Sequence, residues 1–308
     1  MHTSAVRRAS LLPVLVLAAL ACHSSEPAAP APVGKPEPYV PLPDEAPQTI
    51  GYFLTVFDRS LAQWTELKLS ATSPRQQSTL ALLEQNMQKR ARERREELLT
   101  ELETGAPLNR RVAAAALGFT HDPTVLGPLV AALADPDAEV VQRALLALGV
   151  LALRETPMAP IRYHLLNDGD AWTRSNAAFA LLGIANAGNG TSELAESCRA
   201  GLADADAGVR AQCASALGAA ADPTAVAGLG ELLLDDASLV SLASALALAR
   251  IGREHAEQKG TTARALVGAL DQVPSERRAS LLGALRWLSD SNLGDETAAW
   301  REWAYKLP

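Results

Sequence analysis

The chain has 308 residues, of which 48% are hydrophobic and only 4% are aromatic, and it carries a formal net charge of −7. A net negative charge removes the usual electrostatic basis for binding nucleic acid, so no nucleic-acid partner is expected. Abundant Ala and Leu with few aromatic residues favour helices packed through small side chains and disfavour a β-rich fold.

The first 21 residues have the pattern of a secretory signal peptide. Arg7 and Arg8 precede the apolar run "LLPVLVLAALA", which ends in small residues and is too short to serve comfortably as a permanent transmembrane span. Residues 1–21 are therefore predicted to be removed during export.

The stretch from Ala19 to Cys22, "ALAC", resembles the lipobox of bacterial lipoproteins, although the commonest form has Leu in place of Ala19. The resemblance implies cleavage before Cys22 and acylation of its thiol, which would hold the chain on a bacterial membrane. Ordinary signal cleavage that leaves Cys22 as a free thiol is the alternative. Because His23 rather than Asp follows Cys22, the sorting rule of Gram-negative lipoproteins points to the outer membrane, facing the periplasm.

Residues 22–47 form a segment rich in Pro and Ala with little apolar periodicity. This composition is typical of an extended polyproline-type tether. At about 3.1 Å per residue its reach is on the order of 70 Å, so the lipid need not touch the folded part. We therefore expect this tether to connect the membrane to the folded domain.

Residues 48–104 are predicted to form a helical pair ahead of the main domain. The first helix covers residues 48–70, and the second begins at Ser73 and Pro74 and runs without a break to about Glu103. Four aromatic side chains of the first helix are interpreted as a cap that seals one end of an array from water. They are Tyr52, Phe53, Phe57 and Trp64.

A pattern that begins with Asp-Ala recurs along the centre of the chain, with spacings of 33, 36 and 30 residues. In each copy an apolar residue or Thr follows three positions after the Asp, and a small residue follows four positions later still. Each copy predicts one helix whose Asp caps the free amides at its start. The copies begin at Asp137, Asp170, Asp206 and Asp236, and the paired internal positions are Val140 and Ala144, Thr173 and Ala177, Val209 and Cys213, and Leu239 and Ala243.

Second helices are predicted between these copies, and two of them open with Asp-Pro-Thr at Asp122 and Asp222. A Leu-Gly or Ile-Gly ends several of the first helices, and this Gly is expected to supply the left-handed conformation at the helix end. Each unit of about 30 to 36 residues is thus a helix, a turn and a helix. Such a unit buries its apolar face only when neighbouring units stack.

The units resemble HEAT repeats, specifically the short subtype found also in phycobilin lyase subunits. The stretch "DAGVRAQCASALG" from Asp206 has the pattern of that subtype: Asp, then Val-Arg, then an Ala-rich helix, then Leu-Gly. The resemblance covers about residues 105–290 in five to six units. It implies an all-α fold, a right-handed α-solenoid of stacked antiparallel helix pairs with capping helices at both ends. Residues 291–308 form the predicted C-terminal cap, in which the aromatic residues are Trp300, Trp303 and Tyr305.

The same resemblance implies roles for individual side chains. Arg174 and Arg210 occupy equivalent repeat positions and are expected to pair with aspartates of the same or the adjacent unit. Second helices are expected to line the inner curve of the array. On that basis, three residues of one second helix are the candidates for a surface that contacts a partner: Arg162, Tyr163 and His164.

The sequence singles out no catalytic, metal-binding or cofactor-binding residue. The five His residues have no recurring ligand spacing, and neither a Gly-rich phosphate loop nor a Gly-x-Ser-x-Gly elbow occurs. We therefore predict a non-enzymatic, membrane-tethered scaffold or adaptor that binds another protein at the bacterial cell envelope. The alternatives are an enzyme or cofactor chaperone resembling the phycobilin lyase subunits, and a purely structural element of the envelope.

Two cysteines, Cys198 and Cys213, remain if Cys22 is acylated, in a compartment that favours disulfides. They lie on consecutive antiparallel helices at similar distances from the turn between them, so they are candidates for a disulfide. Against a bond, packed helix axes are about 8–10 Å apart, whereas a disulfide needs Cα atoms within about 7 Å. Two small buried thiols are the favoured alternative.

Overall fold

The computed structural model describes residues 49–71 and 73–308, and within these ranges all regular elements are helical. The predicted all-α architecture is confirmed. The predicted signal peptide, the tether and Cys22 lie outside the described residues, and the predicted domain boundaries stay predictions. The α-helices are α1 (Ile50–Ser70), α2 (Pro74–Glu93), α3 (Arg95–Thr104), α4 (Pro107–Gly118), α5 (Leu126–Ala131), α6 (Ala138–Leu151), α7 (Met158–Asn167), α8 (Ala171–Asn186), α9 (Ser192–Gly201), α10 (Ala207–Ala219), α11 (Val226–Leu232), α12 (Ser238–Glu254), α13 (Lys259–Leu270), α14 (Ser275–Ser289) and α15 (Thr297–Tyr305).

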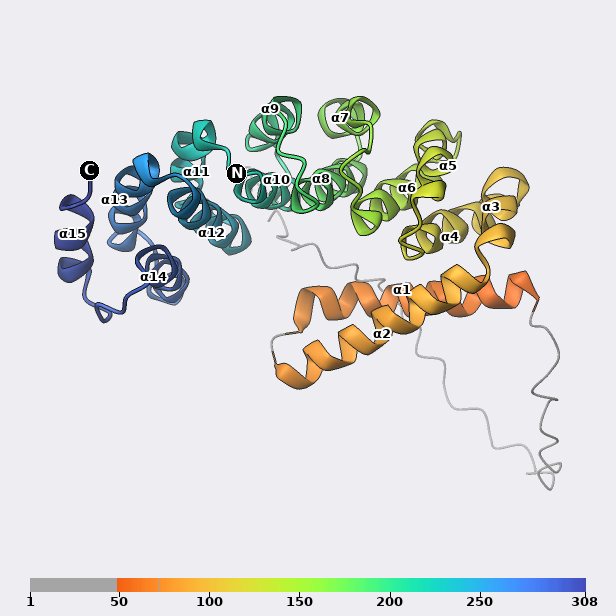
Figure 1. Cartoon of the computed structure of the whole chain (residues 1–308), viewed down its shortest axis with the longest axis horizontal. Helices are drawn as coiled ribbons and strands as arrows, with labels where there is room; N and C mark the ends of the chain where they lie inside the picture. Colours follow the sequence, from red (N-terminus) through yellow and green to blue (C-terminus); the bar gives the residue numbers. More distant parts are fainter. Residues whose placement is uncertain (1–48, 72) are drawn as a thin grey trace, which may run out of the picture.

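Helix pairs stack side by side into an arc, from α3–α4 at one end to α13–α14 at the other (Figure 1). The helices α4, α6, α8, α10 and α12, which we call the inner helices, lie on the concave side of this arc. The outer helices α3, α5, α7, α9 and α11 lie on its convex side. The expectation that the second helices line the inner curve is therefore wrong, because α7, α9 and α11 lie outside.

Three inner helices begin as predicted, because the side chain of an Asp accepts a backbone N–H at the start of each. Asp137 caps α6, Asp170 caps α8 and Asp206 caps α10. The predicted register of the fourth copy is wrong by one residue. Ala237, not Asp236, is the N-cap of α12, so that Val240 is buried while Leu239 is exposed.

The long helix predicted from Ser73 to Glu103 is wrong, because it is broken at Arg94. Arg94 has φ −117° and ψ 18°, which ends α2 before α3 begins. The guanidinium groups of Arg90 and Arg94 lie over the Phe53 ring of α1, 5.3 Å and 5.4 Å from its centre. The α1–α2 hairpin thus forms its own layer on the concave side, while α3 packs against α4 (Figure 1).

The glycines of the Leu-Gly and Ile-Gly pairs serve close helix packing rather than helix termination. A Cβ on Gly183 of α8 would lie 2.3 Å from the carbonyl oxygen of Gly149 on α6, and one on Gly218 of α10 would lie 2.7 Å from the Cα of Ala247 on α12. Both glycines lie within helices, and neither has a positive φ. The expected left-handed role is wrong; the left-handed residues after α4, α6 and α10 are His121, Ala152 and Ala221.

Aromatic side chains pack at both ends of the array, but two of the predicted cap residues, Tyr52 and Tyr305, are exposed. Phe57 and Trp64 of α1 are buried and meet Phe119, just after α4, edge to face at 5.8 Å and 5.3 Å between ring centres. At the other end Trp300 is fully buried and packs on Trp303. These contacts cover the terminal helices, where stacking has no further repeat to supply.

Candidate functional site

A row of side chains runs across the concave side at one repeated position of the inner helices. Each member lies nine residues after the N-cap of its helix, so the row crosses four neighbouring helices in register. Three of the four members are large apolar residues that are only partly buried or are exposed. The row consists of Leu146 on α6, Phe179 on α8, Ser215 on α10 and Leu246 on α12.

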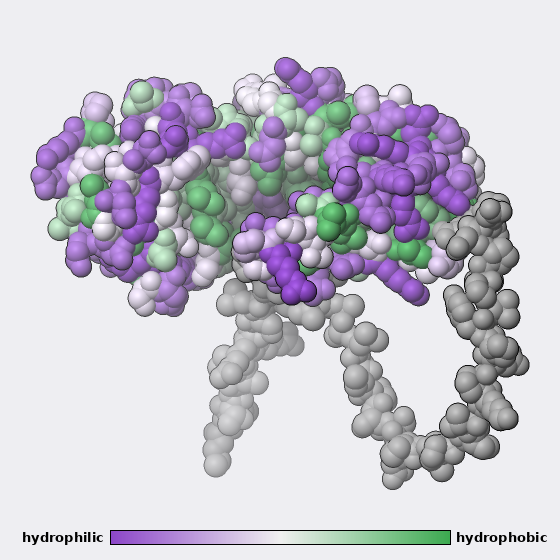
Figure 2. Space-filling model, turned by 60° about the horizontal axis from the view of Figure 1, so that its bottom comes forward, coloured by the Kyte–Doolittle hydropathy of each residue, from purple (hydrophilic) through white to green (hydrophobic). Residues whose placement is uncertain are grey.

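Further apolar side chains lie on both sides of this row, one or two turns away on the same helices. The N-terminal halves of α8 and α12 add Trp172, Leu239 and Leu242, all at least 38% exposed. Between them α10 presents only small or neutral side chains, so the surface is lowest there. In Figure 2, where this side comes forward, apolar side chains lie in a recess between the C-terminal and N-terminal helices. We call this surface the inner face: Leu146, Val150, Trp172, Phe179, Leu182, Ser215, Ala219, Leu239, Leu242 and Leu246.

The helices that form the inner face carry few acidic side chains, which is unusual for an acidic chain. Residues 171–186 of α8 and 207–219 of α10 contain no Asp or Glu, and α12 has only Glu254, its last residue. The basic residues Arg250 and Arg253 follow the apolar residues of α12. Arg253 stacks on Trp287 at 5.3 Å and donates a hydrogen bond to its backbone carbonyl oxygen, which fixes the guanidinium at this edge.

An arginine–aspartate ladder holds the units together beside the inner face, as the resemblance implied for Arg174 and Arg210. Arg174 donates from Nε and Nη2 to the two carboxylate oxygens of Asp204, at 2.7 Å and 3.0 Å. Its Nη1 also donates to the backbone carbonyl oxygen of Asp168. Arg210 holds the next aspartate, Asp235, in the same way, at 2.8 Å and 2.9 Å.

The ladder is interrupted at α6, where Val141 occupies the position of the arginine. The next aspartate, Asp168, instead lies 3.3 Å from Nδ1 of His164. Nε2 of the same ring lies 3.1 Å from the backbone carbonyl oxygen of Leu133 in the preceding unit. His164, one of the residues predicted to contact a partner, is thus largely buried and bridges two units.

The other two residues of that predicted surface also lie on the outer helix α7, away from the inner face. Tyr163 is 63% exposed and Arg162 is half-buried. This row was not predicted from the sequence, because each of its members looks ordinary within its own helix. Comparison of the helices would have shown it: a large apolar residue recurs at the same distance from successive helix starts, at a position that is not part of the buried side.

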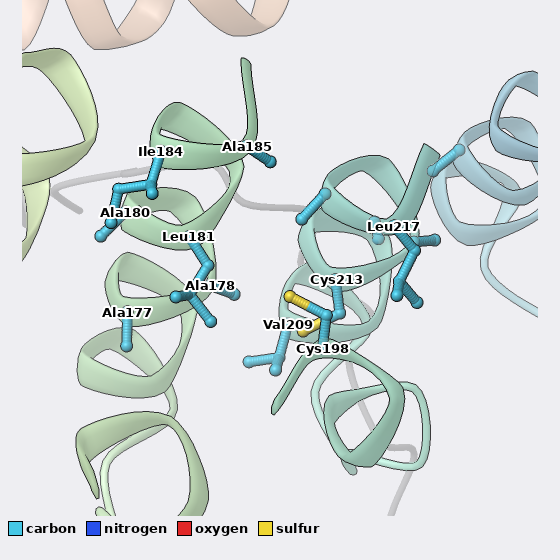
Figure 3. Close-up of a cluster of buried hydrophobic side chains, with 14 of the residues drawn as sticks. Ala177, Ala178, Ala180, Leu181, Ile184, Ala185, Cys198, Val209, Cys213 and Leu217 are labelled. Atoms are coloured by element: carbon cyan, nitrogen blue, oxygen red, sulfur yellow. The ribbon is translucent and has the colours of Figure 1, made fainter. Parts of the chain in front are cut away.

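Cys198 of α9 and Cys213 of α10 are both buried, and the structure has them as free thiols. Their sulfur atoms lie side by side, next to Val209 (Figure 3). A hydrogen bond to Cys198 and then burial raise the pKa of the Cys213 thiol well above its usual range. Gly201 makes room for it, because a Cβ there would lie 2.4 Å from Sγ of Cys213.

We expect a thiol titration of denatured, unreduced protein to find both of these cysteines reactive. In the folded protein both should react slowly, because both thiols are buried away from the reagent. Ellman's reagent with and without denaturant measures the difference. A titration of zero thiols in the denatured protein would mean that Cys198 and Cys213 are bonded.

Within residues 49–71 and 73–308, no group of three or more His, Cys, Asp or Glu side chains is placed to hold a metal ion. No helix of this part of the chain is both long and apolar enough to cross a membrane.

Comparison with known proteins supports the repeat architecture. No curated protein matches the chain. Among solved structures, the designed armadillo repeat protein YIII(Dq)4CqI is 20% identical with a TM-score of 0.51, covering 62% of this chain and 98% of that one. Kap121p is 14% identical with a TM-score of 0.52, covering 79% of this chain and 30% of that one. The CpcE–CpcF complex of phycocyanin lyase from Nostoc sp. PCC7120 is 18% identical, covering 90% of this chain and 100% of that one, at a TM-score of only 0.40.

A family model describes the repeats directly. The HEAT-repeat model matches residues 95–183 and 158–249, which together span just over half of the chain. The first match begins at Arg95, the first residue of α3. At these low identities the structural neighbours support the fold alone, but the family match rests on the repeat sequences themselves. The chain belongs to the HEAT-repeat family.

Proposed function

We propose that this protein is a non-catalytic scaffold or adaptor that binds another protein through the inner face. The observation that carries the proposal is the register of large apolar residues across α6, α8 and α12, of which Leu146 and Phe179 are partly buried and Leu246 is exposed. Monomeric proteins rarely leave large apolar side chains gathered in one exposed region unless it binds something. A solenoid offers an extended concave surface for this purpose.

The proposal includes a lipid anchor at Cys22 and a tether formed by residues 22–47. Several acyl chains hold a protein firmly on a membrane, whereas one chain binds marginally. The tether keeps the scaffold near the outer membrane and raises its effective concentration toward a partner held there. The His residue after Cys22 supports the outer membrane, facing the periplasm.

We expect Cys22→Ala to abolish incorporation of labelled fatty acid and to change the protein's localisation, because no other residue of the sorting signal carries the lipid. Labelling with an alkyne palmitate analogue and fractionation of membranes measure both effects. Cys198→Ala serves as the matched control and should label as the unchanged protein does. Undiminished labelling of Cys22→Ala would contradict the anchor.

The scaffold itself is tested by chemical crosslinking in intact membranes followed by mass spectrometry. A stoichiometric protein partner is expected, and its absence would favour a purely structural role in the envelope. The visible absorbance spectrum of the purified protein tests the alternative of a cofactor chaperone. A bound chromophore would contradict a scaffold that carries no cofactor.

A further inference from the structure

We propose that the inner face binds a short apolar segment of the partner protein that carries Asp or Glu side chains. This inference rests on the proposed function, because it names the chemistry of the segment that the scaffold would hold. Its two supports are the apolar composition of the inner face and the distribution of charge around it.

The inner face resembles the core of a protein interface in its aromatic residues and in having no Lys, Asp or Glu. Such cores are enriched in aromatic residues and Arg and depleted in Lys, Asp and Glu. Trp172 of α8 and Leu246 of α12 are 43% and 47% exposed, and Leu239 and Leu242 of α12 are exposed as well. Partly exposed aromatic residues and Arg are the side chains that most often dominate binding energy.

The charge at the edge of the inner face selects the kind of segment that fits. Arg250 lies thirteen residues after the N-cap of α12, in register with Val150 and Ala219. No ion pair forms at Arg250 or Arg253 within the described part of the chain. Because α8 and α10 have no carboxylates, an approaching carboxylate meets attraction here, whereas an approaching Lys or Arg meets repulsion.

The hairpin side of the inner face does not cancel this positive charge. An ion pair between the hairpin and the inner helices joins Arg143 of α6 to Asp58 of α1 at 3.7 Å, and it is neutral as a unit. The chain as a whole is acidic, with 35 acidic and 28 basic residues. A partner segment with carboxylates is therefore directed to the inner face and away from the rest of the surface.

Site-specific photo-crosslinking of the full, acylated chain in membranes of its native host tests this inference. A photoreactive residue replaces Ser215, at the floor of the inner face, or Tyr163, on the outer helix α7. We expect the probe at 215 to crosslink a segment of another protein that combines apolar residues with Asp or Glu. The double substitution Arg250→Glu and Arg253→Glu should lower the crosslinked yield about tenfold, and Arg162→Glu should leave it unchanged.

The milder substitution Arg250→Gln keeps the test valid if the double substitution unfolds the chain, and it should lower the yield by a smaller factor. Crosslinks from 215 to residues 22–47, to a second copy of the chain, to lipid alone or to a basic segment would overturn the inference. An unchanged yield after charge reversal would overturn it as well. Capture of a protein only from position 163 would contradict binding at the inner face but would leave the scaffold function intact. Capture from neither position, with no partner found by general crosslinking, would contradict both the binding at the inner face and the scaffold function.

Discussion

We expect Gly183→Ala to lower the free energy of unfolding by about 2–3 kcal/mol, the upper part of the range for overpacked cores. The new Cβ would lie 2.3 Å from the carbonyl oxygen of Gly149, which is backbone of the neighbouring helix and has no side-chain rotamer to adopt. Helices α6 and α8 must therefore move apart, which weakens the packing of their buried side chains on both sides of the contact. Urea denaturation followed by circular dichroism measures the loss.

Gly268→Ala is the matched control, because Gly268 lies within α13 and a Cβ there meets nothing within 4 Å. Helix propensity alone should make that variant more stable by about 0.5–1 kcal/mol. The two substitutions add the same methyl group, so opposite signs isolate the effect of the close helix contact. Equal changes in the two variants would contradict the packing role assigned to Gly183.

We expect Arg174→Leu to lower the free energy of unfolding at pH 7 by about 2–3 kcal/mol. The substitution removes two hydrogen bonds to Asp204 and leaves that carboxylate, whose side chain is only 12% exposed, without its charge partner. It also removes the donor to the carbonyl oxygen of Asp168. Denaturation in urea at pH 7 measures the loss.

The loss should shrink in acid. Burial raises the pKa of Asp204, but the Arg174 hydrogen bond and the backbone N–H of Asp206 outweigh it, so the pKa lies below its usual value. A depressed carboxyl pKa stabilises the fold above the unfolded-state value of about 3.9, and this stability is lost as the pH falls through the folded-state pKa. Wild type and Arg174→Leu should therefore converge in stability as the pH is lowered below about 4.

The exposed pair Lys306–Glu302 provides the control, because both side chains are 71% exposed. Lys306→Ala should change the free energy of unfolding by less than about 0.5 kcal/mol. A constant difference between wild type and Arg174→Leu at pH 7 and pH 3 would mean that the Asp204 charge does not cause the loss.

The sequence was sufficient for the repeat unit and the starts of α6, α8 and α10, and the family resemblance for the arginine–aspartate pairs, because each depends on residues at fixed offsets. Asp137, Asp170 and Asp206 each precede a helix that needs a cap, and this requirement is local. The register of the fourth copy was missed because Ala237 stands where the other copies have the capping Asp. The pairing of Arg210 with Asp235, two residues before this N-cap, shows the correct register.

Features that depend on neighbouring helices were not accessible from one helix at a time. The break at Arg94 contains neither Pro nor Gly, and it arises because α2 packs against α1 while α3 packs against α4. The side of the array that becomes concave follows from small rotations between units, which no single unit encodes. For the same reason the inner face was assigned to the wrong helices and His164 to the wrong role.

The glycine contacts between inner helices have a consequence for the curvature of the whole array. Helices that touch through Gly118, Gly183 or Gly218 can approach to the short end of the usual range of about 8–10 Å between axes. Between outer helices the glycine approach is looser, because a Cβ on Gly228 of α11 would lie 3.2 Å from a side-chain atom of Leu202, and the outer helices lie further apart (Figure 1). Each unit is therefore a wedge, narrow at the inner helix, and the radius of the arc is determined by how small these side chains are.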